Sequence, residues 1–268
     1  MYNAVSKSLF AVAITLAVCS CGNSQREAAT ELSLSAENEV KAGNYEGAIA
    51  LLDTLDNRYA SEIEVRKSAM KFRAMAVEGL TIRRITAVDD TLAILKAKMD
   101  ELETKFDYVE NPGKGLGGNF VAKELVKGSY DILPRINDEG YFTISVKIPR
   151  QIGFEHITFI GNGTAATDNI SSSRLVTVEN SEMTVLQQED VAQAMEWLVS
   201  RTNADSYELV GTKSTIKQKL SSNMLNALVT TWQFAQAKQA YRLALIEREK
   251  LERKLQLCRD QLANVIDR

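Results

Sequence analysis

Residues 140–149 read GYFTISVKIP and alternate apolar with polar side chains. Successive side chains of a β-strand point to opposite faces, so this period of two is typical of an antiparallel strand with one buried face. The predicted buried face carries Phe142, Ile144, Val146 and Ile148, and the predicted outer face carries Thr143, Ser145 and Lys147. The stretch therefore places a β-sheet in the middle of a chain whose flanks have a different period.

The segments around this strand repeat the strand signal more weakly. The stretches HITFIG, RLVTVEN, MTVLQQ and SYELVG are short, and clusters of Gly, Asn, Asp and Ser that predict turns separate them. One short helix interrupts the strands, because Val191, Met195 and Leu198 recur at helical spacing. Residues 107–213 are therefore predicted to form a β-rich head with the organisation of a small β-sandwich.

Long helices are predicted on both sides of the head. Residues 61–106 contain one glycine and no proline, and from Ile82 onward their apolar residues recur in steps of three and four. Residues 214–268 lack both helix breakers and carry a second stripe of this rhythm, interrupted only by Arg248, with Thr215 as the predicted start of a capping box. This rhythm is typical of coiled coils. We therefore predict an α+β chain in which the two helices pair antiparallel as a stalk, either within one chain or between chains.

A helical hairpin is predicted over residues 31–60. Gly43 supplies the left-handed conformation that ends one helix, and Asn44 caps the next. The motif GNYEGAIALLDTL, residues 43–55, resembles one tetratricopeptide repeat, although Ala60 stands where such a repeat usually has proline. These repeats stack into a stable core only when about three are present. One copy predicts a packing unit and not a peptide-binding superhelix.

The start of the chain resembles a bacterial lipoprotein signal. Lys7 precedes an apolar stretch that is shorter than the roughly 20 residues needed to cross a bilayer. The stretch ends in VCSC, which resembles a lipobox with Cys21 as the lipidated residue, because Ser20 fits the small position before it. Residues 1–20 are then the predicted signal peptide, and residues 21–30 the predicted linker that follows.

Two alternatives to this interpretation stay open: lipidation of Cys19, and a short uncleaved helix. No aspartate follows Cys21, so the resemblance implies an anchor in the outer membrane, on a face that the motif does not specify. A cysteine carrying several acyl chains anchors stably without a hydrophobic helix. Only Cys258 then remains unlipidated, which leaves no intramolecular disulfide.

The order of these parts resembles a family of lipoproteins common in Bacteroidetes. The stretches that carry the resemblance are GNYEGAIALLDTL, EVRKSAMKFR, LKAKMDELETKF and SYELVGTKSTIKQKL. The resemblance implies the architecture and brings no activity with it. In these bacteria secreted proteins carry O-glycans at Asp followed by Thr and an apolar residue, which makes Thr54 and Thr91 candidate acceptors.

Composition and motifs argue against several functions. The net charge is −3, whereas a domain that binds nucleic acid shows a basic surplus. The single histidine, His156, rules out a multi-histidine metal site, and Cys258 falls on an apolar stripe that predicts burial. The glycines of NPGKGLGGN match neither a phosphate loop nor a dinucleotide loop, so we predict a flexible linker there. We expect no cofactor, no metal and no catalytic residue.

Two classes of function remain. The first is a membrane-anchored, non-catalytic lipoprotein that binds a protein partner or holds an envelope assembly together. The second is a surface glycan-binding lipoprotein, whose candidate stacking residues in the head are Tyr130, Tyr141, Trp197 and Tyr207. Two or more of these aromatic rings exposed on one face would favour a glycan, and an apolar patch on the head or on the TPR-like hairpin would favour a protein.

Overall fold

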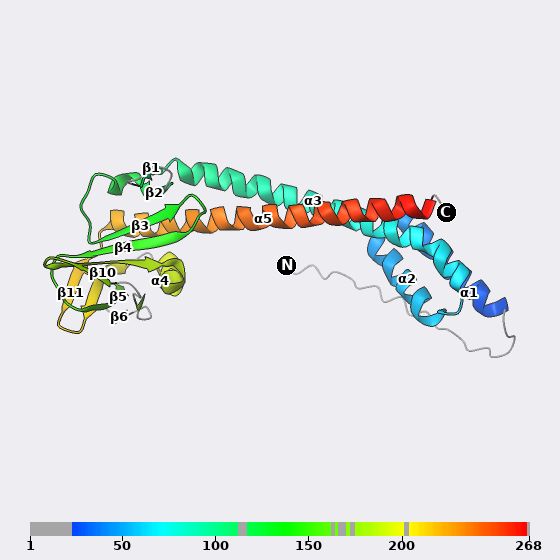
Figure 1. Ribbon diagram of the computed structural model, residues 1–268, viewed down its shortest axis with the longest axis horizontal. Helices are drawn as coiled ribbons and strands as arrows, with labels where there is room; N and C mark the ends of the chain where they lie inside the picture. Colours follow the sequence, from blue (N-terminus) through cyan, green and yellow to red (C-terminus); the bar gives the residue numbers. More distant parts are fainter. Residues whose placement is uncertain are drawn as a thin grey trace, which may run out of the picture. The chain divides into compact units, whose positions relative to one another are not determined.

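The computed structural model describes residues 23–111, 117–161, 164–165, 170–171, 175–200 and 204–266 (Figure 1). The chain has the α+β class predicted from its sequence, with helices at both ends and antiparallel sheets between them. Its described residues divide into two compact units, one within residues 23–84 and 251–266 and one within residues 85–250. Two long helices, α3 (Ile63–Glu103) and α5 (Ser222–Ile266), contribute residues to both units.

The first unit is helical. Helices α1 (Asn23–Lys41) and α2 (Tyr45–Arg58) pack against each other and against the start of α3. Their shared core consists of Ala29, Ala36, Val40, Ala48, Leu52, Leu55, Ala69, Phe72 and Ala76. The predicted turn is confirmed, because Gly43 has a φ of +74° and the Asn44 side chain accepts a hydrogen bond from the Gly47 amide at 3.2 Å. The predicted linker is wrong from residue 23 onward, since those residues begin α1 and bury Ala29.

Close packing of α2 on α3 depends on a glycine. The ring of Tyr45 lies over Gly79, where a Cβ atom would stand 2.2 Å from the ring Cζ. The guanidinium of Arg83 lies 4.8 Å from the centroid of the same ring. Gly79 thus admits an aromatic ring where any other residue would push it away.

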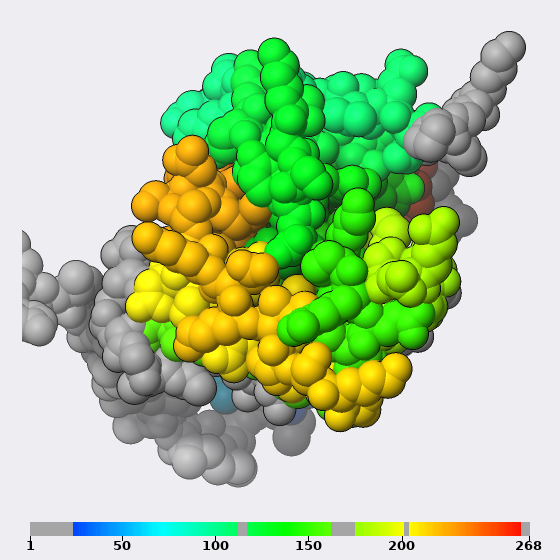
Figure 2. All heavy atoms as spheres, turned by 90° about the vertical axis from the view of Figure 1, so that its left-hand side faces the viewer, coloured from blue at the N-terminus to red at the C-terminus, as the bar shows by residue number. Residues whose placement is uncertain are grey.

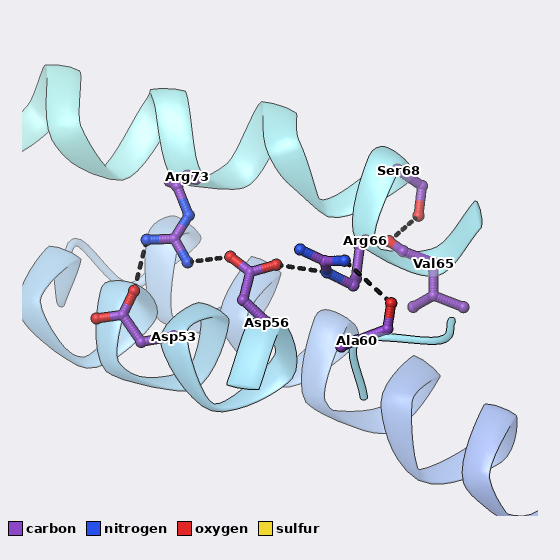
Figure 3. Close-up of polar contacts among 7 residues, drawn as sticks. All are labelled: Asp53, Asp56, Ala60, Val65, Arg66, Ser68 and Arg73. Atoms are coloured by element: carbon purple, nitrogen blue, oxygen red, sulfur yellow. Dashed lines mark hydrogen bonds and ion pairs between the residues drawn. The ribbon is translucent and has the colours of Figure 1, made fainter. Parts of the chain in front are cut away.

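Ion pairs join α2 to α3 at the surface (Figure 3). Arg73 contacts Asp53 at 2.7 Å and Asp56 at 2.9 Å, and Arg66 contacts Asp56 at 2.7 Å. Arg66 also donates a hydrogen bond to the carbonyl of Ala60 at 3.1 Å. All four charged side chains are at least a third exposed, so each pair contributes only about 0.2–1 kcal/mol.

The second unit contains two antiparallel sheets. The six-stranded sheet has the order β1-β2-β3-β4-β9-β8, and the smaller sheet has the order β11-β10-β5-β6, with β7 also paired to β5. The strands are β1 (Phe106–Glu110), β2 (Gly118–Ala122), β3 (Ile132–Asn137), β4 (Phe142–Ile148), β5 (Phe154–Gly161), β6 (Thr164–Ala165), β7 (Ile170–Ser171), β8 (Leu175–Val178), β9 (Ser181–Gln187), β10 (Ala204–Gly211) and β11 (Thr215–Lys219).

The two sheets share one core with helix α4 (Gln188–Ser200) and the start of α5. The alternation predicted for β4 is confirmed, because Phe142, Ile144, Val146 and Ile148 are all buried. The four weaker stretches are also strands, and α4 buries the apolar residues predicted for it. In Figure 2 the start of α5, in orange, lies among strands of the head.

Six strands were not predicted from the sequence: β1, β2, β3, the two-residue strands β6 and β7, and β11. Strands β1 and β2 pair with Glu110 opposite Gly118, so the predicted flexible linker is wrong as a link between stalk and head. It is the connection of a β-hairpin, of which residues 112–116 lie outside the described structure. The predicted capping box at Thr215 is also wrong, since Thr215 begins β11 and pairs with Val210. Helix α5 starts at Ser222, after the Ser221 hydroxyl accepts a hydrogen bond from the Met224 amide at 3.2 Å.

The early part of α5 belongs to the head and not to a free-standing stalk, which corrects the predicted boundary at residue 214. Trp232 packs edge-on against Phe142, with ring centroids 5.2 Å apart. Phe234 packs against Phe106, with centroids 5.0 Å apart. Farther along α5 in the same unit, Arg248 donates to Asp89 of α3 at 2.6 Å. The two helices therefore run antiparallel within this unit, and the one polar break in the α5 stripe is explained by an ion pair.

The stripe predicted from Ile82 is shifted at its start. In the first unit Thr81 is buried and donates to the Val77 carbonyl, whereas Ile82 is 43% exposed. In the same unit Arg259 of α5 pairs with Glu78 of α3 at 2.9 Å, and Cys258 is buried, as predicted.

Candidate binding groove

The outer face of the six-stranded sheet carries an open groove of about 650 Å³. It lies across β3, β4, β9 and β8, on the side opposite the shared core. The residues that line it are Tyr130, Leu133, Arg135, Ser145, Val146, Lys147, Val176, Met183, Thr184, Val185 and Gln187. Among the exposed apolar side chains here, Val176 is 56%, Met183 43% and Val185 41% exposed.

Strand pairing arranges the groove in rows of outward-facing side chains. The first row is Arg135, Thr143 and Gln187, the second is Leu133, Ser145 and Val185, and the third is Lys147, Met183 and Val176. Neighbouring strands lie about 4.8 Å apart and successive rows about 7 Å apart. The middle row, in which apolar Leu133 and Val185 flank Ser145, therefore lies between two rows that each carry a cation.

Strand β9 has an orientation that its polarity does not predict. Glu182 and Thr184 are 3% and 4% exposed on the core side, whereas Met183 and Val185 face solvent. A shift of one residue in the pairing would reverse both faces. The apolar surface of the groove therefore exists because β9 is held in the register that exposes Met183 and Val185, while Leu186 is buried beside Glu182 and Thr184.

The buried carboxylate of Glu182 gives this register its physical reason. Its two oxygens accept hydrogen bonds from the backbone amides of Gly153 at 2.8 Å and Phe154 at 3.0 Å. A buried charge is tolerated only when it is hydrogen-bonded in this way. Glu182 of the six-stranded sheet thereby provides acceptors for the amides at the start of β5 in the other sheet, and with Glu182 facing inward Met183 and Val185 face outward.

The charges in the groove are all positive. Arg135 and Lys147 are the charged residues in the described lining, and within the described ranges neither side chain has a hydrogen-bond or ion-pair partner. The Nε of Arg135 is also shielded from solvent. A desolvated donor without an acceptor costs about 1–3 kcal/mol. In a chain with a net charge of −3, this surface offers its free charge to an anion.

One of the four predicted stacking residues lines the groove. Tyr130 stands at its rim, where its hydroxyl donates to the carbonyl of Glu124 at 3.1 Å. Tyr207 is buried, so its ring cannot stack on a ligand. The same burial raises the pKa of its hydroxyl. The hydroxyl of Tyr141 donates to the carboxylate of Glu189, and this bond raises the pKa of Tyr141 to about 12. Trp197 packs on the core of the head from α4.

The residues weighed for catalysis do not converge on a site. His156 lies half-buried on β5, opposite Val210 of β10 and Ser171 of β7, and no carboxylate partner for it is seen in the described segments. The same segments contain no group of three or more His, Cys, Asp or Glu side chains that could hold a metal ion.

The predicted modification sites divide between surface and undescribed sequence. The hydroxyl of Thr91 is on an exposed part of α3 and donates to the Ala87 carbonyl at 2.8 Å. Thr54 is half-buried on α2 and donates to the Ala50 carbonyl at 2.9 Å. Cys21 lies outside the described residues.

Sequence reasoning did not find the groove residues. It placed Lys147 on the outer face of β4, but it did not single out Arg135, Met183 or Val185. The available signal was the pair of polar residues, Glu182 and Thr184, inside a strand of otherwise apolar character.

Across the described ranges, no helix is both long and apolar enough to span a membrane. Comparison with protein families, curated proteins and solved structures found no match.

Proposed function

We propose that this protein is a non-catalytic lipoprotein that binds a partner protein of the cell envelope through the groove on its head. The lipobox resemblance supports an anchor at Cys21 in the outer membrane. The helices would form an antiparallel coiled-coil stalk, and α1 and α2 would act as a single TPR-like packing unit. The close pairing of Tyr45 with Gly79 and the contact of Asp89 with Arg248 support those two parts of the proposal.

The observation that carries the proposal is the inverted polarity of β9. A strand that buries Glu182 and Thr184 while exposing Met183 and Val185 violates the ordinary inside-outside pattern. Natural proteins break such local rules mainly at functional or strained sites. An exposed apolar patch with a polar rim is the usual mark of a protein-binding surface.

A protein partner is favoured over a glycan by the chemistry of the lining. Stacking on a sugar uses flat aromatic faces, and among the four candidates only Tyr130 borders the groove. The groove is lined by aliphatic Leu133 and Val185 in its middle row and by Met183 in its third row. Aliphatic side chains recognise other apolar side chains better than they recognise hydroxyl-rich sugars.

Site-specific crosslinking tests the proposal. A photo-crosslinking amino acid placed at Met183 should capture a partner in the envelope of the producing cells, whereas the same group at Leu245 should not. Both positions are 43% exposed and lie in the same unit, so exposure alone cannot explain a difference.

The captured protein should then be purified and its binding measured directly. Val185→Glu should weaken that binding at least tenfold, because the charge would be buried in an apolar contact. Ile246→Glu is the matched control, since Ile246 is 40% and Val185 41% exposed. Equal capture from both crosslinking positions, or equal binding by both charge variants, would refute a role for the groove.

A further inference from the structure

The two cations of the groove indicate the chemistry of the partner, provided that the groove is the binding surface proposed above. We propose that the groove binds an extended segment of the partner protein that carries two carboxylates four residues apart, with an apolar side chain midway between them. The inference rests on the spacing, the charge and the free hydrogen-bonding capacity of the lining residues.

The spacing follows from the strand register. Arg135 is in the first row on β3, and Lys147 is in the third row on the neighbouring strand β4. At the rise of a strand, the two rows are about 13 Å apart along the strands, and one strand separates them sideways by about 4.8 Å. Their Cα atoms are therefore about 14 Å apart.

An extended peptide matches this geometry. Side chains at positions i, i+2 and i+4 of an extended segment point to the same side, and the first and last are about 13 Å apart. Carboxylates at i and i+4 would meet Arg135 and Lys147, while the side chain at i+2 would reach Leu133 and Val185 in the middle row. A helical segment would place its i and i+4 residues only about 6 Å apart, so carboxylates at that spacing on a helix would not span both cations.

The charge of the groove selects a carboxylate over a neutral group. Neither Arg135 nor Lys147 has an anionic partner in the described part of the chain. The planar guanidinium of Arg135 suits a two-oxygen anion. Bound carboxylates would supply the acceptors that these donors lack.

The experiment measures peptide binding to the full chain by fluorescence anisotropy. The probe is a labelled nine-residue peptide of serine and threonine with glutamates at its third and seventh positions and leucine at its fifth. One comparison peptide has glutamine at both glutamate positions, and another has the two glutamates adjacent at its third and fourth positions. The protein variants are Arg135→Gln and Lys147→Gln, with Lys213→Gln as the control cation, because Lys213 is exposed outside the groove.

We expect the first peptide to bind at least tenfold more tightly than the glutamine peptide and more tightly than the adjacent-glutamate peptide. Arg135→Gln and Lys147→Gln should each remove most of that preference, and Lys213→Gln should retain it. Lys147 is exposed, so its variant tests the proposal even if Arg135→Gln folds poorly. The preference should also decrease with added salt, because it arises from opposite charges.

Several outcomes would overturn the inference, and they separate it from the proposed function. Equal binding of the glutamate and glutamine peptides, with loss of both in Val185→Glu, would leave a protein-binding groove without carboxylate recognition. Absence of peptide binding together with capture from Met183 would have the same meaning. Binding to anionic phospholipid vesicles that depends on Arg135, without peptide binding, would assign the groove to a membrane surface instead.

Discussion

Substitution of Gly79 by alanine tests how α2 is held on α3. Alanine in place of glycine within a helix normally stabilises it by about 1 kcal/mol, because glycine loses more backbone entropy on folding. Here the new Cβ would lie 2.2–2.5 Å from three atoms of the Tyr45 ring. Ordinary contact between carbon atoms begins near 3.5 Å, so the ring would have to move by more than about 1 Å.

The cost of that displacement exceeds the gain in helix propensity. Overpacking a well-filled contact costs about 1–3 kcal/mol. The ring would also lose its cation–π contact with Arg83, worth about 0.5–1 kcal/mol at such a partly exposed site. After subtraction of the propensity gain, Gly79→Ala should lower the free energy of unfolding by about 0.5–3 kcal/mol.

A double-mutant cycle measures the effect and includes its own control. In a Tyr45→Ala background the clash is absent, so Gly79→Ala should stabilise the protein by about 1 kcal/mol. The two backgrounds should therefore differ by about 1.5–4 kcal/mol, which overlaps the range expected of residues in contact. Urea denaturation followed by circular dichroism gives the free energies, and hydrogen exchange at Leu52 and Leu55 reports on the first unit alone. Gly79→Ala that stabilises both backgrounds equally would show that Tyr45 does not pack on Gly79.

The remaining predictions concern the anchor, the end of α5, a surface tyrosine and His156. Cys21→Ala should abolish incorporation of a fatty-acid probe and Cys19→Ala should retain it; the reverse result would identify Cys19 as the lipidated residue. Removal of residues 250–268 deletes the buried side chain of Leu251, whose burial is worth about 1.5–3 kcal/mol, and the ion pair of Arg259 with Glu78. Hydrogen exchange of the α3 amides in residues 74–84 should therefore accelerate. Unchanged exchange rates would mean that α5 does not stabilise α3 there. The hydrogen bond that the Tyr141 hydroxyl donates to Glu189 raises the pKa of Tyr141 to about 12. Stability from this bond is therefore present below about pH 10 and is lost as the pH rises toward 12. The unfolding free energy of Tyr141→Phe should fall less steeply than that of the unchanged protein over that interval, and parallel curves would contradict this. His156→Ala should fold and keep full binding to the captured partner, whereas loss of binding in a folded variant would assign His156 a functional role.

Much of the fold could be predicted because its elements have strong local periods. The alternation in residues 140–149 identified β4, and the helical spacing of Val191, Met195 and Leu198 identified α4. Gly43 followed by Asn44 located the turn between α1 and α2, because left-handed glycine and an asparagine cap are local chemistry. Such signals need no knowledge of distant partners.

The missed elements depend on partners far away in sequence. Strand β3 contains Pro134 and short β11 has an alternating charged pattern, so neither is typical of a strand when considered alone. Strand β11 forms because Ile216 pairs opposite Leu209 of β10. The same holds for α5, whose Phe234 continues the stripe of a stalk in sequence but packs on Phe106 of the head. Periodicity shows which face is apolar and does not show what covers that face.

The sequence by itself determined the α+β class, the turn at Gly43, the presence of a long helix on each side of the strands and the acidic net charge, because each is a local or additive property of the residues. Only the tertiary structure decided which face of β9 is buried. The polarity of the β9 residues alone would place Met183 and Val185 inside. The Glu182 carboxylate is instead buried because it accepts hydrogen bonds from the amides of Gly153 and Phe154 at the start of β5. A buried carboxylate bound by two amides fixes the register, since a one-residue shift would leave all three groups unsatisfied. That long-range bond leaves the apolar residues outside, beside two free cations, and so creates the groove.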